Sequence, residues 1–180
     1  MKELSLNILD ITENSVKAKA TLVEISIIES TELLSISVRD NGTGMTEEIL
    51  NQVRNPFYTT RTTRRVGMGI PLLQFAAEQT GGKVMISSRH IVEHPANHGT
   101  EITAHFYKNH IDFTPLGDVI SSIVTLIQGH PNVDFVFNHV SDNKTVELDT
   151  RQLREVLEGV PLDTFEVLLW IRENLAEQYE

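Results

Sequence analysis

The chain has 180 residues, a formal net charge of −10 and no cysteine, and 40% of its residues are apolar and 22% charged. This composition is typical of folded globular proteins, and it excludes disulfides and thiolate zinc sites. The negative charge argues against a nucleic-acid partner. The lack of a long apolar run argues against a membrane partner. We therefore expect a cytoplasmic protein.

The first forty residues predict a helix followed by a β-hairpin. Apolar residues recur at helical spacing over residues 3–18, and Ser15 lies on the same stripe. Residues 21–30 and 33–40 are two runs of alternating β-branched residues separated by a polar turn. Alternation of this kind is typical of paired strands.

Residues 41–68 contain turn formers and little periodicity, which is typical of a functional loop in a compact domain. A helix with Pro71 in its first turn follows, and then two strands over residues 83–89 and 99–107. The order predicts the α+β class. We expect a two-layer sandwich in which helices cover one face of a mostly antiparallel, mixed sheet.

After the last of these strands the pattern predicts a helix that starts at Pro115, a hairpin over residues 133–150 and two final helices. We place a boundary near Asn109. Residues 1–109 then form the first domain, and residues 110–180 form a small C-terminal α/β unit of unknown role. No linker rich in Gly, Ser or Pro separates them, so we expect the unit to pack against the domain.

The first helix carries a polar stripe on which Asp10 and Asn14 are one turn apart. A carboxylate and a carboxamide on one stripe can hold magnesium and orient a water molecule. A solvated helix face has the same appearance. The stripe by itself therefore leaves both interpretations open.

A second candidate feature is the segment Asp40–Met45, which follows a strand. Asp40 shares the register of Leu34, Ile36 and Val38, so its side chain should point toward the apolar side of the sheet. A buried carboxylate must accept hydrogen bonds, and the exocyclic amine of a purine can donate them. A turn in which the segment satisfies only its own backbone is the alternative.

The third candidate feature joins Arg61, Arg64 and Arg65 to the turn Gly67-Met68-Gly69, which opens the predicted second helix. Backbone N–H groups at a helix N-terminus attract phosphate, and three arginines in an acidic chain favour a polyanion at this place. A solvated basic loop is the alternative interpretation. Thr100, with inward parity beside Asp40, can fix a water or the edge of a base, although threonine commonly opens strands.

In this order the features resemble the ATPase superfamily of gyrase, heat-shock chaperones, histidine kinases and MutL (GHKL, or Bergerat fold). The resemblance implies ATP and Mg²⁺ as cofactors, with the metal on Asn14 and the adenine amine on Asp40. The segment from Pro56 to Arg61 is similar to the phenylalanine box of histidine kinases, which favours that subfamily. The ATP-binding residues that the resemblance implies are Asn14, Asp40, Gly42, Gly44, Met45, Phe57, Thr60, Arg61, Gly67, Met68, Gly69 and Thr100.

The resemblance makes Asp10 the candidate catalytic residue, because members that hydrolyse ATP often carry a glutamate one turn before the magnesium asparagine. Asp10 is one methylene shorter, and Glu13 points elsewhere on the helix, which makes it the weaker base. Histidine kinases carry a dimerising helical hairpin with the phospho-accepting histidine before this asparagine. Only thirteen residues precede Asn14, so we expect no such hairpin within this sequence.

We therefore hypothesise a stand-alone Mg-ATP-binding regulatory module of the histidine-kinase or anti-sigma-kinase type, which phosphorylates or switches a partner protein. One alternative is a MutL-like ATPase in which nucleotide drives dimerisation, so that the chain forms a homodimer. Another is a non-catalytic adaptor that keeps the fold. The sequence leaves open whether the protein is an enzyme and, if so, whether it is a protein kinase or a slow ATPase.

Overall fold

The computed structural model describes residues 3–54 and 69–180. None of the helices in this part of the chain combines the length and the apolar character that a bilayer crossing requires. The elements in chain order are α1 (Leu4–Lys17), β1 (Leu22–Glu29), β2 (Leu33–Asp40), α2 (Glu47–Arg54), α3 (Gly69–Gln79), β3 (Lys83–Arg89), β4 (Gly99–Tyr107), α4 (Val119–Gly129), β5 (Asp134–Ser141), β6 (Lys144–Asp149), α5 (Thr150–Leu157) and α6 (Phe165–Tyr179).

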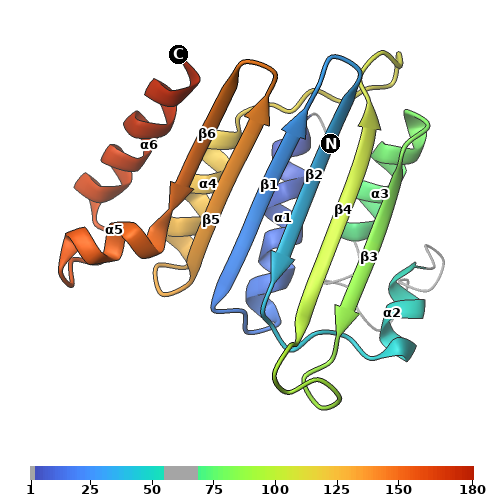
Figure 1. Ribbon diagram of the computed structural model, residues 1–180, viewed down its shortest axis with the longest axis horizontal. Helices are drawn as coiled ribbons and strands as arrows, with labels where there is room; N and C mark the ends of the chain where they lie inside the picture. Colours follow the sequence, from blue (N-terminus) through green and yellow to red (C-terminus); the bar gives the residue numbers. More distant parts are fainter. Residues whose placement is uncertain (1–2, 55–68) are drawn as a thin grey trace.

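Six strands form one sheet in the order β3-β4-β2-β1-β5-β6. Strand β1 pairs with β5 in parallel, and the other neighbouring strands pair antiparallel. Helices α1, α3 and α4 lie behind the sheet in Figure 1 and cover one of its faces, while the other face is turned to the viewer. The predicted fold class, a two-layer α+β sandwich with a mixed, mostly antiparallel sheet, is confirmed.

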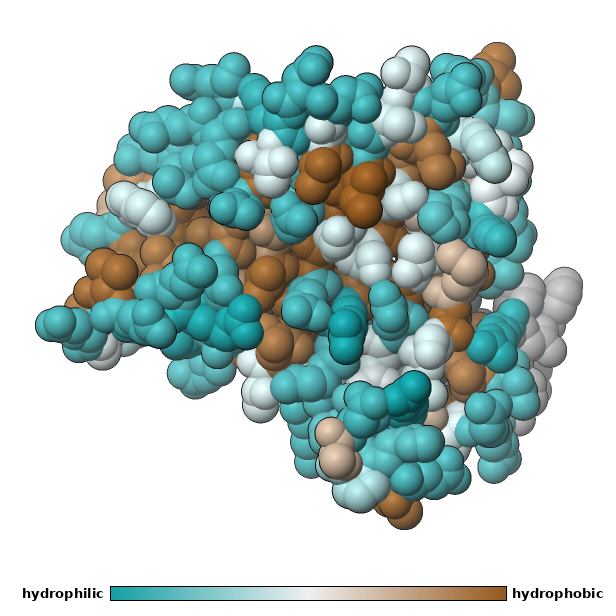
Figure 2. All heavy atoms as spheres, in the orientation of Figure 1, coloured by the Kyte–Doolittle hydropathy of each residue, from teal (hydrophilic) through white to brown (hydrophobic). Residues whose placement is uncertain are grey.

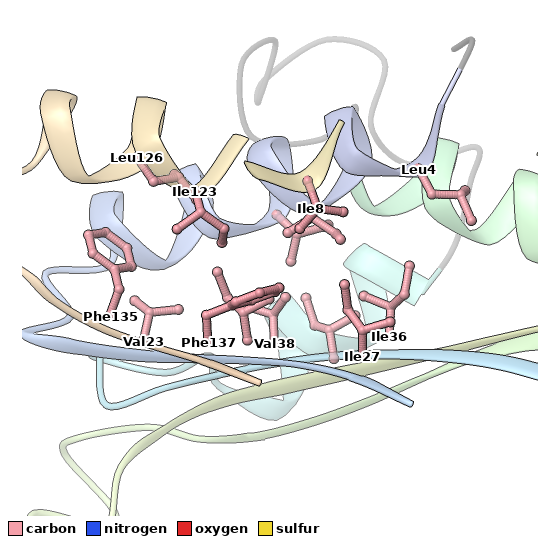
Figure 3. Packing of buried hydrophobic residues seen from close by; sticks show 14 of the residues in the cluster. Leu4, Ile8, Val23, Ile27, Ile36, Val38, Ile123, Leu126, Phe135 and Phe137 are labelled. Carbon is pink, nitrogen blue, oxygen red and sulfur yellow. The ribbon is translucent and has the colours of Figure 1, made fainter. Parts of the chain in front are cut away.

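The core lies between the sheet and these three helices, because successive side chains of a strand point to opposite faces. In the central strands β1 and β2 the inward side chains include Val23, Ile27, Ile36 and Val38, which are 0%, 0%, 2% and 3% exposed. Figure 3 shows these side chains pointing toward the helical layer, where Ile8 of α1 faces them. Helix α1 is thereby held against the middle of the sheet.

The elements after residue 110 extend the same sheet and the same helical layer. Strand β5 pairs with β1 over seven registered positions, from Leu22 with Asp134 to Ile28 with Val140. Helix α4 packs beside α1, and the Ser122 hydroxyl donates a buried 3.1 Å hydrogen bond to the Ser5 carbonyl. The division of the chain near Asn109 stays a prediction.

The predicted long loop over residues 41–68 is wrong in one respect, because its middle forms helix α2. This helix has eight residues and buries only Leu50. Acidic residues open the segment and Arg54 closes it, but eight residues make only about two turns, a length at which periodicity does not separate a helix from a loop. Packing decides its conformation.

The predicted start of the fourth helix at Pro115 is also wrong. The helix begins at Val119, where the Asp118 carboxylate accepts a 2.9 Å hydrogen bond from the Ser121 N–H and caps the first turn. The carbonyl of Pro115 instead accepts a 2.9 Å hydrogen bond from the N–H of Leu4, at the start of α1. The segment before α4 is thus used to anchor α1.

A hydrogen-bonded chain joins α6 to the sheet. His139 on β5, which is 6% exposed, is hydrogen-bonded through Nδ1 to the Tyr179 hydroxyl at 2.7 Å and through Nε2 to the Glu29 carboxylate at 3.1 Å. Lys108 donates a 2.9 Å hydrogen bond to the other Glu29 oxygen. Burial raises the pKa of Glu29, but Lys108 and then His139 lower it by more, so this pKa lies below its ordinary value.

We expect Phe137→Ala to lower the free energy of unfolding by about 3–5 kcal/mol, because removing a buried ring leaves a cavity. The Phe137 side chain is 1% exposed in the core between β5 and α4. Ile28→Ala is the control, because Ile28 is 56% exposed on the opposite face and its loss should cost under about 1 kcal/mol. Urea denaturation followed by circular dichroism measures both. If the main unfolding transition of Phe137→Ala occurred at the same urea concentration as that of the wild type, this would contradict the folding of β5 together with the rest of the sheet.

We expect the stability difference between the wild type and Glu29→Gln to depend on pH. A carboxyl group whose pKa is lowered by folding contributes stability above its unfolded pKa, and the contribution disappears as pH falls through the folded value. The wild type should therefore unfold at higher urea concentration than Glu29→Gln near neutral pH, and the two should converge below about pH 4. A difference that stays constant over this range would exclude the ionised Glu29 as its cause. Glu32→Gln, an exposed change at the same end of the sheet, should follow the wild type.

Candidate functional site

Helix α1 presents Asp10 and Asn14 to the start of α3. A Cβ atom built on Gly69, the first residue of α3, would lie 3.4 Å from the Asp10 Cβ and 3.6 Å from the Asn14 Nδ2. The Asn14 Nδ2 is buried and has no hydrogen-bond partner among residues 3–54 and 69–180. The N-terminal turn of α3, whose free N–H groups favour anions, therefore adjoins this face of α1.

The Asp40 carboxylate lies at the end of β2 and joins the sheet to α1. Its Oδ2 accepts a 2.6 Å hydrogen bond from the Ser15 hydroxyl. Its Oδ1 accepts from the N–H of Gly42 at 2.8 Å and from the N–H of Thr100 at 3.3 Å. Strand pairing places Asp40 directly opposite Thr100, so the carboxylate is held from three directions.

Ser88 on β3 connects the loop after β2 to the start of β4. Its Oγ accepts a 2.7 Å hydrogen bond from the Met45 N–H and donates at 3.1 Å to the Gly99 carbonyl. The Ser88 and Thr100 hydroxyls are 2.8 Å apart. Either hydroxyl can donate in this contact, and in both cases the Thr100 oxygen keeps a lone pair for a further donor.

Two glycines allow the loop after Asp40 to approach its surroundings closely. A Cβ on Gly42 would lie 2.7 Å from the Ala18 carbonyl oxygen. Gly44 has φ +71°, and a Cβ there would lie 2.0 Å from the Arg89 carbonyl oxygen, a distance that no side chain tolerates. His98 is hydrogen-bonded through Nδ1 to the Gly42 carbonyl and secures the loop from the β3–β4 connection.

The electrostatic surroundings of Asp10 and Glu13 differ. Burial raises the pKa of the Asp10 carboxyl above its ordinary value, the charge of Glu13 raises it further, and Lys17 opposes both. Glu13 does not face the start of α3. Its two carboxylate oxygens lie 2.9 and 3.0 Å from Nε2 of His130, which follows α4, so Glu13 is engaged with the C-terminal half of the chain.

Magnesium, which the resemblance implies, takes oxygen ligands and usually keeps several waters. The described residues contain no group of three or more His, Asp or Glu that could hold a metal on its own. The Asn14 carboxamide can offer one oxygen to a metal, although the atom that it turns toward Gly69 in this structure is Nδ2. This donor set fits a magnesium ion that is held mainly by phosphate oxygens and water.

The structure brings all eight of the described candidate residues into two groups, one at the interface of α1 with α3 and one at the end of β2. Asp10, Asn14 and Gly69 form one group. Asp40, Gly42, Gly44, Met45 and Thr100 form the other around the loop after β2. The candidates Phe57, Thr60, Arg61, Gly67 and Met68 lie outside the described residues. The functional roles of all these residues stay predictions.

Three residues of the site were not among the sequence candidates. Ser15 binds Asp40, Ser88 organises the loop, and His98 holds the Gly42 carbonyl. Ser15 had a detectable signal, because it is a hydroxyl on the otherwise apolar stripe of its helix. Ser88 and His98 had none, since their contacts depend on the pairing of β3 with β4.

A model of the family described as histidine kinase-, DNA gyrase B-, and HSP90-like ATPase matches residues 2–110. Sporulation kinase C of Bacillus subtilis (strain 168) is 32% identical over 90 residues, which are 49% of this chain and 20% of that kinase. Sensor histidine kinase YvrG of the same organism is 30% identical over 101 residues, which are 53% of this chain and 16% of that kinase. The chain thus spans 20% or less of these curated relatives.

Two solved structures share the fold. The MutL ATPase domain of Aquifex aeolicus complexed with ADP has a TM-score of 0.55 at 20% identity, and the match covers 88% of this chain and 70% of that one. The N-terminal domain of a DNA repair protein has a TM-score of 0.55 at 16% identity, with 83% and 53% covered. The 88% of this chain that matches the MutL ATPase domain is more than residues 2–110 can supply. The common fold therefore includes elements of the C-terminal half.

We expect Gly44→Ala to lower the free energy of unfolding by about 2 kcal/mol or more, because a side chain is strained at positive φ and meets the Arg89 carbonyl. Gly129→Ala is the matched control. Apart from its chain neighbours and its own helix, no described atom lies within 4 Å of the added methyl there. Alanine also favours the helical conformation, so stability should be unchanged or slightly higher. Urea denaturation of both variants measures the difference. Equal stability of the two would contradict the close approach at Gly44.

Proposed function

Because the chain belongs to the family of histidine kinase-, DNA gyrase B- and HSP90-like ATPases, we propose that it is an Mg-ATP-binding regulatory module that phosphorylates or switches a partner protein. Its similarity to a sporulation kinase and a sensor histidine kinase supports the kinase type. Its net charge of −10 and lack of cysteine support a cytoplasmic protein with a protein partner, rather than nucleic acid, as the target.

The hydrogen bonding of Asp40 is the observation that carries this proposal. A carboxylate offers about four acceptor positions, and the donors from Ser15, Gly42 and Thr100 fill three of them. Among the described residues no donor fills the fourth position, which is then open to an outside donor. The exocyclic amine of adenine is such a donor, and the Thr100 hydroxyl oxygen lies beside it as a second acceptor for the base or a bridging water.

The phosphate end of the site follows from the position of α1 relative to α3. Asn14 is next in sequence to Ser15, so a base bound at Asp40 directs its phosphates along α1 toward Asn14 and Gly69. The N–H groups that open α3 bind the phosphate oxygens there. Magnesium, when bound, neutralises phosphate charge, and Asn14 would be its protein ligand.

Asp10 is placed to act on a water near the γ-phosphate. Its Cβ lies toward Gly69 at the start of α3, and a raised pKa makes a carboxylate a better proton acceptor. A kinase does not require this base, because the acceptor group of the partner replaces water. The effect of substituting Asp10 therefore distinguishes a hydrolytic function, which requires this base, from a phosphotransfer function, which does not.

The second candidate is a MutL-like ATPase in which nucleotide drives the formation of a homodimer. The position of Asp10 one turn before Asn14 favours this candidate. So does the likeness to the MutL ATPase domain, which extends into the C-terminal half. A non-catalytic adaptor is the third alternative, and it predicts that ATP does not bind.

We expect Asp40→Asn to weaken Mg-ATP binding by about tenfold or more, because the carboxamide places a donor where the adenine amine also donates. Asp142→Asn, which makes the same change on an exposed turn, should bind as the wild type does. Isothermal titration calorimetry with Mg-ATP measures both. Equal affinities for the wild type and Asp40→Asn would contradict the adenine role of Asp40, and a wild type that does not bind ATP would favour the adaptor.

We expect Asp10→Asn to retain ATP binding and to remove any steady-state hydrolysis. The variant should be at least as stable as the wild type at pH 7, because burial disfavours the ionised Asp10 in the folded protein. Loss of turnover would thus not reflect unfolding. Negligible turnover in the wild type supports the regulatory kinase or switch. Steady turnover that needs Asp10, with ATP-dependent dimerisation in sedimentation velocity, would support the MutL-like alternative instead.

A further inference from the structure

The uncovered face of the sheet carries a groove far from the Asp40 loop, between α5, α6 and strands β5 and β6. The groove has a volume of about 590 Å³. Its apolar side chains include Val136 on β5, Leu153 and Val156 on α5, and Trp170 on α6. Val156 is 80% and Trp170 48% exposed. Figure 2 shows apolar surface gathered in this region of the same view as Figure 1.

The walls of the groove are fixed by contacts along the edge of the sheet. Gln178 of α6 accepts a 2.8 Å hydrogen bond from the Glu147 N–H and donates a 3.0 Å hydrogen bond to the Glu147 carbonyl. These contacts occupy the outward N–H and carbonyl of Glu147 in the middle of β6, which hinders the addition of another strand at this edge. Trp170 and Asn174 share the face of α6 that carries Gln178, because they are spaced by four residues.

The charged side chains that line the groove are two carboxylates. Asp149 is already neutralised by Arg151, whose Nε and Nη2 donate to its two oxygens at 3.0 and 2.8 Å. Glu147 is exposed and has no ion-pair partner among residues 3–54 and 69–180. The groove thus offers one free negative charge at its Gln178 end and an aromatic ring about two turns back along α6.

We infer that this groove binds a basic segment of a partner protein, with an arginine or lysine side chain beside Glu147 and apolar residues against Val136, Val156 and Trp170. An unpaired carboxylate selects a cation, a half-exposed indole ring attracts both cations and apolar groups, and the apolar walls bury the neighbouring side chains. The inference rests on the proposed function, because that function is what calls for a partner protein. Binding in the groove itself requires no nucleotide.

The test uses a fluorescein-labelled synthetic peptide of alternating leucine and arginine, with a twin in which citrulline replaces every arginine. Fluorescence anisotropy with the full chain, without nucleotide, should give binding of the arginine peptide and at least about tenfold weaker binding of the twin. Because ATP is absent, a failure here does not affect the test of Asp40, and a failure at Asp40 does not affect this one.

Glu147→Gln should weaken binding of the arginine peptide by about tenfold, since it removes the free charge at constant shape. Glu101→Gln is the matched control. It makes the same change of net charge at an exposed position of β4 on the same sheet face, and it should alter the affinity by less than about twofold. Trp170→Ala should weaken both peptides, because it removes an apolar wall.

Three results would overturn the inference. The first is no binding of the arginine peptide, and the second is equal binding of its citrulline twin. The third is an equal effect of Glu147→Gln and Glu101→Gln, which would mean that only the overall charge of −10 attracts the peptide. A dimer in sedimentation velocity that Glu147→Gln dissociates would also overturn it, by placing a second copy of the chain in the groove.

Discussion

The 2.6 Å hydrogen bond from the Ser15 hydroxyl to Asp40 joins the helix at the centre of the fold to the end of a central strand. The bond is short because its acceptor is ionised, and it fixes the rotation of α1 over the sheet. With α1 in this orientation, its apolar side chains face the core, and Asn14 is turned to the start of α3. The two halves of the candidate site therefore depend on the same contact that packs the helix.

Helix α1 also connects the site to the C-terminal half. Glu13 is adjacent to Asn14, and its carboxylate contacts His130 after α4. The start of α1 is hydrogen-bonded to the segment before α4, and β1 pairs with β5. A rotation of α1 in response to a ligand would therefore require α4 to move with it. This mechanical connection is what a nucleotide-dependent switch needs if a partner binds to residues after 110.

Charge is distributed unevenly between the two surfaces. The Asp40 carboxylate accepts hydrogen bonds from Ser15, Gly42 and Thr100. In the groove at α5 and α6 the Glu147 carboxylate is unpaired among the described residues. The first arrangement holds a loop in place, and the second leaves a charge exposed in a groove. The acidity of the whole chain thus does not indicate its function, because individual carboxylates have different roles.

The sequence by itself determined the fold class, the inward direction of Asp40, and those helices and strands whose apolar residues recur with a clear helical or alternating pattern. Each of these follows from local periodicity and strand parity. Only the tertiary structure decided the helix over residues 47–54, the cap of α4 at Asp118 and the parallel pairing of β5 with β1. It also decided the contacts of Ser88 and His98. These features depend on which segments meet in space, and hydrogen bonds between residues far apart in the chain leave no periodic pattern in the sequence.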